Sequence, residues 1–142
     1  MQVKIKRIDT SLPMPEYHTD GAVAFDIYTR EASTLSPHDF VTLPTNLIIQ
    51  IPEGYMLLVA PRSSSAKKKG LNMRNGVGII DQDFCGPEDE LRVMIQNLDG
   101  ETKYIERGER IAQGIFIPIV KPTFLEVAEV AEKSRGGFGT TG

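Results

Sequence analysis

Short alternating segments, separated at close intervals by Gly and Pro, are the feature that most limits what this chain can fold into. Leu91, Val93 and Ile95 illustrate the alternation, with apolar side chains at every second position, as in half-buried β-strands. Many short strands with regular turn signals are typical of a sandwich or barrel. The predicted strands lie within residues 2–8, 46–52, 55–60, 76–80, 90–97, 113–120 and 124–130.

The sequence offers a single candidate helix, of about two turns, over residues 63–70. Ser63 or Ser64 can cap its start, and Gly70 can end it. The chain has 142 residues, which suits one domain. We therefore predict an all-β fold, a small jelly-roll-like barrel with one short helix. Residues 1–131 form this barrel, and the glycine-rich residues 132–142 form a flexible C-terminal arm without core periodicity.

Composition excludes several classes of function. The formal net charge of −3 gives no overall cationic surface for a nucleic-acid backbone, so no nucleic-acid partner is expected. Cys85 is the only cysteine, so an intramolecular disulfide is impossible and a reducing compartment fits best. No leader or apolar run long enough for a membrane span is visible, and we expect a soluble, cytoplasmic protein with no membrane partner.

The scarcity of histidine and cysteine also limits metal chemistry. Two histidines and one cysteine lie far apart in the sequence, which nearly excludes ligation by sulfur or imidazole. Any metal is therefore expected to be a hard cation held by oxygen.

Two stretches in the first half carry more polar chemistry than a strand core needs. Asp26 is a lone carboxylate inside the apolar run AVAFDIYT (residues 22–29), and the face of an edge strand would also explain it. In PRSSSAKKKG (residues 61–70), Arg62 and three serines lie at the start of the predicted helix, where free N–H groups bind anions readily. An ordinary helix cap before a solvated lysine face is the structural alternative.

The stretch NGVGIIDQDFCG (residues 75–86) is more specific. Strand alternation places Asp81 and Asp83 on one side of the chain, where two carboxylates repel each other unless a cation or a proton intervenes. Such a pair often serves as a general base or a metal site, with salt bridges to arginines as the structural alternative. Phe84 follows directly, and an aromatic ring beside a carboxylate suits a sugar or a base.

Two later stretches are weaker signals on their own. In YIERGERIAQG (residues 104–114), Arg110 and Gln113 follow a tight turn at Gly108, and they could simply pair within the sheet. The chain finishes in SRGGFGTTG (residues 134–142), which is either a frayed end or a flap that closes over a ligand. Small residues permit close backbone approach to phosphates, and hydroxyls can donate to them.

Taken in order, five of these motifs resemble the trimeric dUTPases, and the resemblance covers nearly the whole chain. The motifs are AFD, PRSSSAKKKG, GVGIIDQDF followed by CG, GERIAQ and GGFGTTG. The resemblance implies hydrolysis of dUTP to dUMP and pyrophosphate in a homotrimer, with Mg²⁺ as cofactor. This activity limits uracil incorporation into DNA and supplies dUMP for thymidylate synthesis. The arm of one subunit is expected to close over an active site of its neighbour.

The resemblance also implies roles for individual residues. Asp81 matches the carboxylate that activates the attacking water, Gln113 a phosphate or water contact, and Asp26 a residue connected through water to Mg²⁺ on the triphosphate. Phe84 matches a position usually held by Tyr, whose ring packs on the deoxyribose and excludes a 2′-hydroxyl. The implied substrate-binding residues are Arg62, Ser63 and Ser64 for the phosphates; Asn75, Ile79 and Ile80 for the nucleoside; and Arg92, Lys133, Arg135, Phe138, Gly139 and Thr140 for the pocket and the tail.

Four departures from the family pattern affect these assignments. Residues 87–89 (PED) look like an insertion, so the pocket assignment of Arg92 depends on where the gap is placed. Lys133 and Arg135 both lie near the position of the usual tail cation, and either could reach the γ-phosphate. Ala24 and Ser64 each stand where Gly is usual.

Two other functions fit parts of the pattern. A dCTP deaminase shares the family fold and a similar RSS turn, whereas IDQDF and GGFGTTG match the hydrolase better. A non-catalytic module that senses nucleotides would be expected to lose the carboxylate or the arm, and this sequence contains both.

Overall fold

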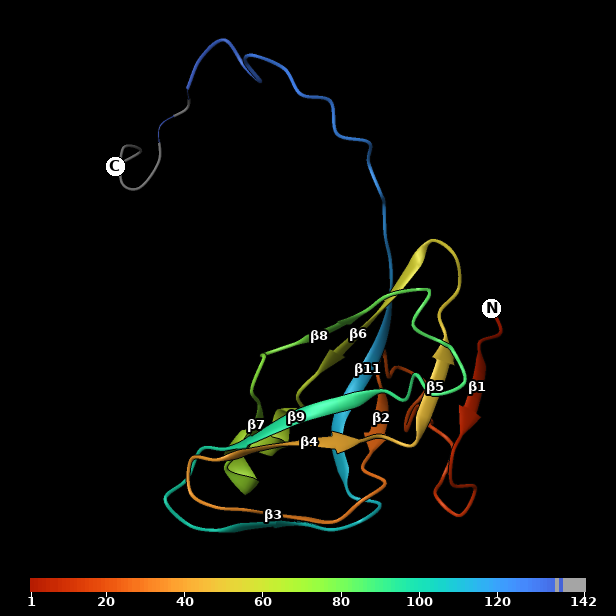
Figure 1. Ribbon diagram of the computed structural model, residues 1–142, viewed down its shortest axis with the longest axis vertical. Helices are drawn as coiled ribbons and strands as arrows, with labels where there is room; N and C mark the ends of the chain where they lie inside the picture. The colour runs from red at the N-terminus through yellow and green to blue at the C-terminus, as the bar shows by residue number, and fades with distance from the viewer. Residues whose placement is uncertain (135, 137–142) are drawn as a thin grey trace.

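The structure, a computed structural model, describes residues 1–134 and 136. Within these residues the regular structure consists of short strands and one short helix, as the sequence predicts, in a jelly-roll-like arrangement (Figure 1). The strands are β1 (Lys4–Arg7), β2 (Phe25–Tyr28), β3 (Ser33–Leu35), β4 (Phe40–Pro44), β5 (Leu47–Gln50), β6 (Tyr55–Ala60), β7 (Leu71–Met73), β8 (Gly78–Ile80), β9 (Arg92–Asn97), β10 (Lys103–Ile105) and β11 (Arg110–Pro118).

The described strands join in antiparallel groups. One sheet has the order β2-β11-β6-β8, a second has the order β4-β9-β7, and β1-β5 and β10-β3 form two-stranded pairs. The long strand β11 lies between β2 and β6, so residues distant in sequence become neighbours in the first sheet. This sheet carries most of the residues of interest for function.

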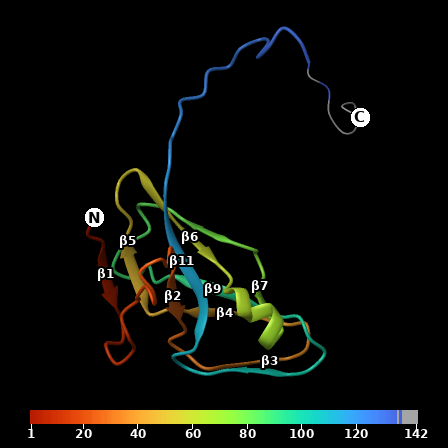
Figure 2. The ribbon, with the colours of Figure 1, turned by 180° about the vertical axis from the view of Figure 1, so that it is seen from behind.

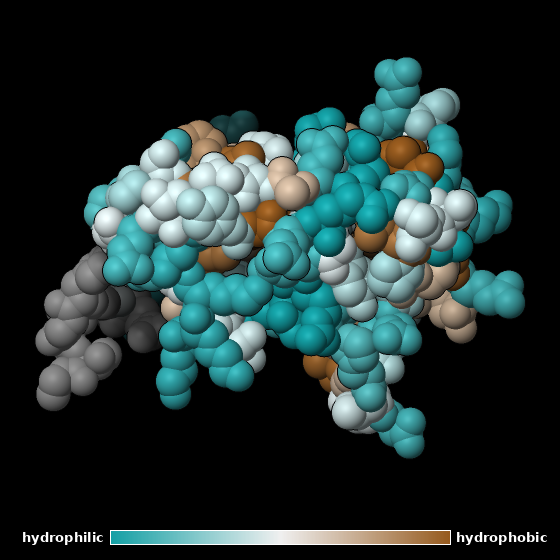
Figure 3. Space-filling model, turned by 90° about the horizontal axis from the view of Figure 1, so that it is seen from below, coloured by the Kyte–Doolittle hydropathy of each residue, from teal (hydrophilic) through white to brown (hydrophobic). Residues whose placement is uncertain are grey.

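The alternation in the sequence explains the core. Leu91, Val93 and Ile95 are buried, as predicted, and they join one cluster with apolar side chains from both main sheets. The polar residues that alternate with the apolar ones face outward. Seen from below, the surface is mostly hydrophilic, with small separate hydrophobic areas (Figure 3). A strand with one buried face requires this pattern.

The helix η1 (Ser65–Lys69) is a single wide turn at the predicted position. The Ser64 side chain forms no capping hydrogen bond, so the start of the helix is not capped as the sequence suggested. Gly70 ends it in the left-handed conformation at φ 64°, and a Cβ there would lie 1.9 Å from Asp99 Oδ2. The backbone conformation therefore favours glycine at this position, whereas the partly exposed Asp99 side chain could move aside.

The strand predicted over residues 124–130 does not form. Beyond β11 the described chain leaves the barrel as an extended, exposed segment (Figures 1 and 2). Phe124 and Leu125 are 92% and 84% exposed, and Val130 is 95% exposed. A strand needs a hydrogen-bonded neighbour, and residues 124–130 lie against no other part of the described chain. No helix in the described residues is long and apolar enough to cross a membrane.

Candidate active site

Asp26 is the centre of a charged network in the first sheet. The residue lies on β2 and is only 7% exposed. Its Oδ1 accepts a hydrogen bond from Arg62 Nε at 2.8 Å, and its Oδ2 accepts one from Arg110 NH1 at 3.1 Å. His18 Nε2 lies 2.9 Å from the same Oδ2. A buried carboxylate needs such partners, and these fix both arginines in place.

The three strands of this region explain why these residues meet. Gln113 on β11 is opposite Asp26 on β2 and opposite Ala60 on β6. The Gln113 Nε2 donates to Pro61 O at 3.0 Å, where the chain leaves β6. Arg62 follows Pro61 directly, so the end of β6 delivers its guanidinium to Asp26. An irregularity in register between Arg110 and Ala112 shifts the Arg110 end of β11 relative to β2.

This cluster places two guanidinium groups on one buried carboxylate. Two guanidinium groups share the single carboxylate of Asp26, and each uses one of its five N–H donors for that contact. The nearby Glu16 Oε1 lies 3.4 Å from His18 Nδ1 rather than on an arginine. Burial, together with the charge of Asp26, raises the pKa of the Tyr28 phenol on the same strand. A site with fixed, incompletely used guanidinium groups is suited to phosphate oxygens.

Ser63 and Ser64 continue from Arg62 into η1. Ser63 is exposed and Ser64 is half-buried, whereas Ser65 is buried and its N–H donates to Arg62 O at 3.0 Å. The turn thus holds the serines beside the arginine network. Asp26, Arg62, Arg110 and Gln113 are brought together by the fold, with Ser63 and Ser64 adjoining them.

The hairpin before and along β8 holds the second group of predicted residues. Asn75 Nδ2 donates to Val77 O at 2.9 Å, and Gly76 has φ 72°, which together close the turn. Ile79 is 63% exposed, and Ile80 is half-buried against the core. The hairpin therefore presents two apolar side chains, Val77 and Ile79, and an amide to solvent.

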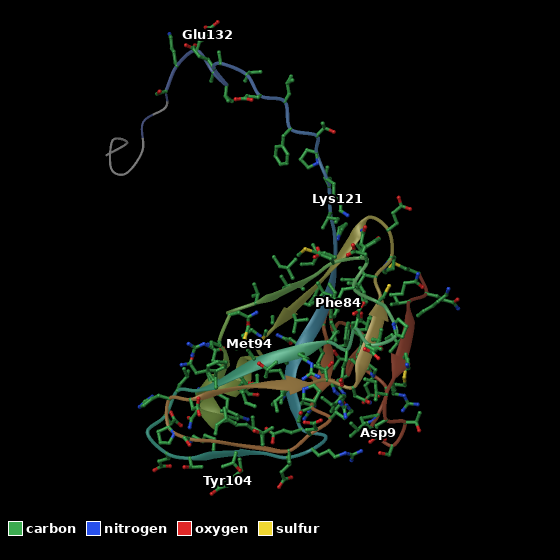
Figure 4. The ribbon with its side chains drawn as sticks, in the orientation of Figure 1. Asp9, Phe84, Met94, Tyr104, Lys121 and Glu132 are labelled. Carbon is green, nitrogen blue, oxygen red and sulfur yellow. The ribbon has the colours of Figure 1, made fainter. Side chains whose placement is uncertain are left out.

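Asp81 follows β8 directly, and Phe84 lies three residues further along the chain. Asp81 is exposed, and Phe84, labelled in Figure 4, is 39% exposed. Backbone hydrogen bonds from Phe84 N to Asp81 O (3.4 Å) and from Cys85 N to Asp83 O (3.0 Å) fold this stretch into a tight loop. An accessible carboxylate can activate a water molecule, and an accessible aromatic ring beside it can pack against a sugar.

The strand register places the Asp26 network and the Asp81 loop far apart within one chain. Ile80 is opposite Leu57 on β6, so Asp81 lies level with Met56, whereas Asp26 lies level with Ala60. The offset is about 13 Å along the strands, and the three strand spacings from β8 to β2 add about 14 Å across. With ideal strand spacings, Asp81 and Asp26 of the same chain are therefore about 20 Å apart.

Other predicted residues lie away from both groups. Arg92 is exposed on β9, opposite Pro44 in the second sheet. Lys133 is exposed on the extended segment beyond the barrel. Arg135, Phe138, Gly139 and Thr140 lie outside the described residues.

His18 is a residue that the sequence did not single out. It lies in an irregular segment before β2, and only the folded chain brings its ring to Asp26. The sole signal in the sequence was a histidine eight residues before a carboxylate, and that spacing alone indicates nothing.

Comparison with known proteins places this arrangement in a family. A family model described as dUTPase matches residues 10–142. Together with the jelly-roll-like fold, this match defines the class of the protein, an all-β nucleotide hydrolase. The chain belongs to the dUTPase family.

Individual relatives agree with this conclusion. The chain is 36% identical to the deoxyuridine 5′-triphosphate nucleotidohydrolase of Hydrogenobaculum sp. (strain Y04AAS1), over all of this chain and 99% of the relative. It is 39% identical to the Brucella melitensis biotype 2 protein of the same name, over 92% of this chain and 85% of the relative. The protein is thus an enzyme, a dUTP diphosphatase.

Solved structures share the fold. The dUTPase of Staphylococcus bacteriophage 80alpha, determined with dUPNHPP, has a TM-score of 0.83 and 28% sequence identity. The match covers 99% of this chain and 98% of that one. The dUTPase of Streptococcus mutans has a TM-score of 0.77 and 29% identity over 84% of this chain and 98% of the other.

Proposed function

We propose that the protein hydrolyses dUTP to dUMP and pyrophosphate by in-line attack of water at the α-phosphorus. The observation that carries the proposal is the Asp26 carboxylate holding both Arg62 and Arg110, at 2.8 and 3.1 Å. Charge develops on the phosphate oxygens during this reaction, and guanidinium groups fixed beforehand can stabilise it without reorganising. Ser63 and Ser64 add hydroxyl donors beside Arg62.

Asp81 is the general base in this proposal. Its exposed carboxylate accepts a proton from the attacking water, which it also orients. Gln113, held by Pro61 O, contacts a phosphate or the water through its remaining amide groups. Little covalent chemistry is required of the protein, because positioning and charge stabilisation dominate phosphoryl transfer.

The β8 hairpin binds the nucleoside. The bond from Asn75 to Val77 O takes one amide N–H, and the amide oxygen and second N–H can face uracil. Ile79 and Ile80 line the pocket, which is too tight for the 5-methyl group of thymine. The Phe84 ring packs on the deoxyribose and excludes a 2′-hydroxyl.

Mg²⁺ is the proposed cofactor, carried mainly by the triphosphate. The chemistry of Asp26 fits a contact through water, since two arginines and a histidine already occupy its oxygens. A bound Mg²⁺ would neutralise charge on the leaving pyrophosphate. The role of Asp26 is then to orient the two arginines and to accept a hydrogen bond from a water ligand of the ion.

We propose further that the active sites are shared in a homotrimer. Asp81 and Asp26 of one chain are about 20 Å apart, too far to act on one phosphate, so a complete site takes them from different copies. The exposed apolar segment beyond β11, which includes Phe124, Leu125 and Val130, is suited to cover another copy.

The arm of residues 132–142 completes the site in this proposal. Phe138 stacks over uracil, Gly139 and Thr140 lie near the terminal phosphates, and Lys133 or Arg135 supplies a cation. Arg92 lies in the other sheet of its own chain, so it can line the nucleotide pocket only of a neighbouring subunit. Closure of the arm excludes bulk water.

The cellular role follows from the chemistry. Removal of dUTP limits uracil incorporation into DNA, and the product dUMP supplies thymidylate synthesis. We place the enzyme in the cytoplasm, where its single thiol stays reduced. The phage 80alpha structure with dUPNHPP supports dUTP as substrate.

The test is a substrate panel. Purified protein is incubated with Mg²⁺ and dUTP, dCTP, dTTP or UTP, and pyrophosphate and ammonia are measured. We expect rapid pyrophosphate release from dUTP alone and no ammonia from dCTP. Ammonia from dCTP would identify a deaminase instead, and nucleotide binding without either product would identify a sensing module.

A further inference from the structure

Gln82 lies between the two carboxylates of the β8 loop, and its side chain is fully engaged within the same chain. Its Nε2 donates to Tyr55 O at 2.8 Å and to Pro52 O at 3.4 Å. Its Oε1 accepts a hydrogen bond from Lys121 Nζ at 3.1 Å. Two donors and one acceptor thus fix the orientation of this amide.

The partners of Gln82 are themselves joined. Tyr55 N donates to Pro52 O at 3.1 Å, which closes the turn between β5 and β6. Ile119 N donates to Gly54 O at 2.8 Å, so the same turn holds the end of β11. Lys121 follows where the chain leaves the barrel (Figure 4). One turn therefore anchors both the β8 loop and the base of the C-terminal segment.

This anchor acts on the neighbouring carboxylate. Asp81 is the residue directly before Gln82, and its side chain is exposed rather than packed. The position of an exposed carboxylate depends on the backbone that carries it, and here the side chain next along the chain holds that backbone to a strand end. An error of about 1 Å in placing a catalytic group can lower a rate about 100-fold.

We infer that Gln82 is a positioning residue for Asp81, holding the catalytic loop to the turn of residues 52–55. Lys121 orients the Gln82 amide and ties this anchor to the segment that leads into the arm. The inference rests on the proposed function, in which Asp81 accepts the proton of the attacking water. It adds to that function a residue that contacts neither substrate nor metal.

Three variants test the contacts of the Gln82 side chain separately. Gln82→Ala removes all of them. Gln82→Glu keeps the size and the contact with Lys121 but turns a carboxylate oxygen toward the carbonyls of Pro52 and Tyr55. Lys121→Met removes only the contact with the C-terminal segment. Gln50→Ala is the control, since Gln50 is an exposed glutamine at the end of β5.

The measurements are kcat and KM for dUTP, together with the thermal midpoint. We expect kcat to fall about 10- to 100-fold in both Gln82 variants, with KM within about threefold of the parent. Lys121→Met should lower kcat less than the Gln82 variants do, and Gln50→Ala should match the parent.

A double-mutant cycle distinguishes positioning from a general structural defect. If Gln82 acts through Asp81, Gln82→Ala should change the residual rate of an Asp81→Asn protein by less than about twofold. An equal loss of kcat in both backgrounds would overturn the inference, as would parental kcat in Gln82→Glu. In either case the parent still hydrolyses dUTP, so the proposed function survives. A parent without dUTP hydrolysis would instead overturn both.

Discussion

Arg30 donates two parallel hydrogen bonds to Glu90, from Nε to Oε1 and from NH2 to Oε2, each 3.0 Å long. The backbone N–H of Asn46 adds a third, to Oε1 at 2.8 Å. Glu90 is only 7% exposed, and burial acts to raise the pKa of its carboxyl. The guanidinium of Arg30 and the Asn46 N–H outweigh burial, and the pKa is lowered overall.

This pair has a clear position in the fold. Residues 87–89, which look like an insertion against the family pattern, end directly at Glu90. Asp89 Oδ2 accepts a hydrogen bond from Gly86 N at 2.6 Å, so the inserted residues form a closed turn. Glu90 then fixes the return of the chain into β9 (Arg92–Asn97). The inserted loop therefore does not disturb the sheet.

We expect Glu90→Gln to destabilise the protein by about 2 kcal/mol at neutral pH, because it weakens hydrogen bonds to a buried charge. A group whose pKa is lowered by folding stabilises the fold above its unfolded pKa, and that stabilisation is lost as pH falls through the folded value. The difference between parent and variant should therefore shrink as pH falls below about 4.

Urea unfolding at a fixed protein concentration measures this difference across pH. Glu31→Gln is the matched control, because Glu31 pairs with the same arginine at 3.5 Å but its side chain is 58% exposed. The control should cost well under about 1 kcal/mol. Equal effects of the two substitutions would contradict a special role for the buried pair.

Much of the fold could be predicted from the sequence, since alternation and turn residues report local burial directly. The segment YMLLVA, for instance, coincides with β6 (Tyr55–Ala60). The segment of residues 124–130 shows the limit of this reasoning. Its apolar residues predicted a strand, but a strand also needs a neighbour, and the described part of this chain provides none.

The site was predictable only as separate motifs. The pattern indicated that Asp26, Arg62 and Asp81 carry chemistry, but it gave no distances between them. Register places Asp26 beside Arg62 and places Asp81 far from both, and this depends on which strands pair. The contacts of His18 and Gln82 arise from irregular segments, for which the sequence has no periodic signal.

We expect Asp81→Asn to lower turnover of dUTP at least about 100-fold while nucleotide affinity changes little, because only the proton acceptor is removed. Single-turnover kinetics and binding of a non-hydrolysable dUTP analogue measure the two quantities. Asp83→Asn is the control, since it changes the same charge two residues away. Near-normal turnover in Asp81→Asn would remove Asp81 from its role.

Sugar discrimination should depend on the Phe84 ring. Phe84→Ala opens space for a 2′-hydroxyl, so the ratio of kcat/KM for UTP to that for dUTP should rise. Phe84→Tyr should be nearly neutral, because packing rather than hydrogen bonding excludes ribose. An unchanged ratio in the alanine variant would show that another group performs this selection.

Two truncations should separate the functions of the C-terminal segment. Removing residues 132–142 should leave the oligomer and the thermal midpoint close to the parent, with most turnover lost. Removing residues 121–142 also deletes the exposed apolar side chains of Phe124, Leu125 and Val130, and it should weaken assembly. Light scattering and dUTP turnover test both. Full activity in the shorter deletion would exclude a catalytic arm.

The sharpest test concerns the separation of Asp81 from Arg62. Two inactive chains are co-expressed with different affinity tags, one carrying Asp81→Asn and the other Arg62→Met, and mixed oligomers are isolated by tandem purification. In a mixed trimer with sites formed between copies, one site takes an intact Arg62 from the first chain and an intact Asp81 from the second. About one third of the parental activity should return. Asp81→Asn chains mixed with chains lacking residues 132–142 should recover activity for the same reason. If verified mixed trimers stay inactive in the first experiment, Asp81 and Arg62 must serve the same site from one chain, and the shared-site proposal is wrong.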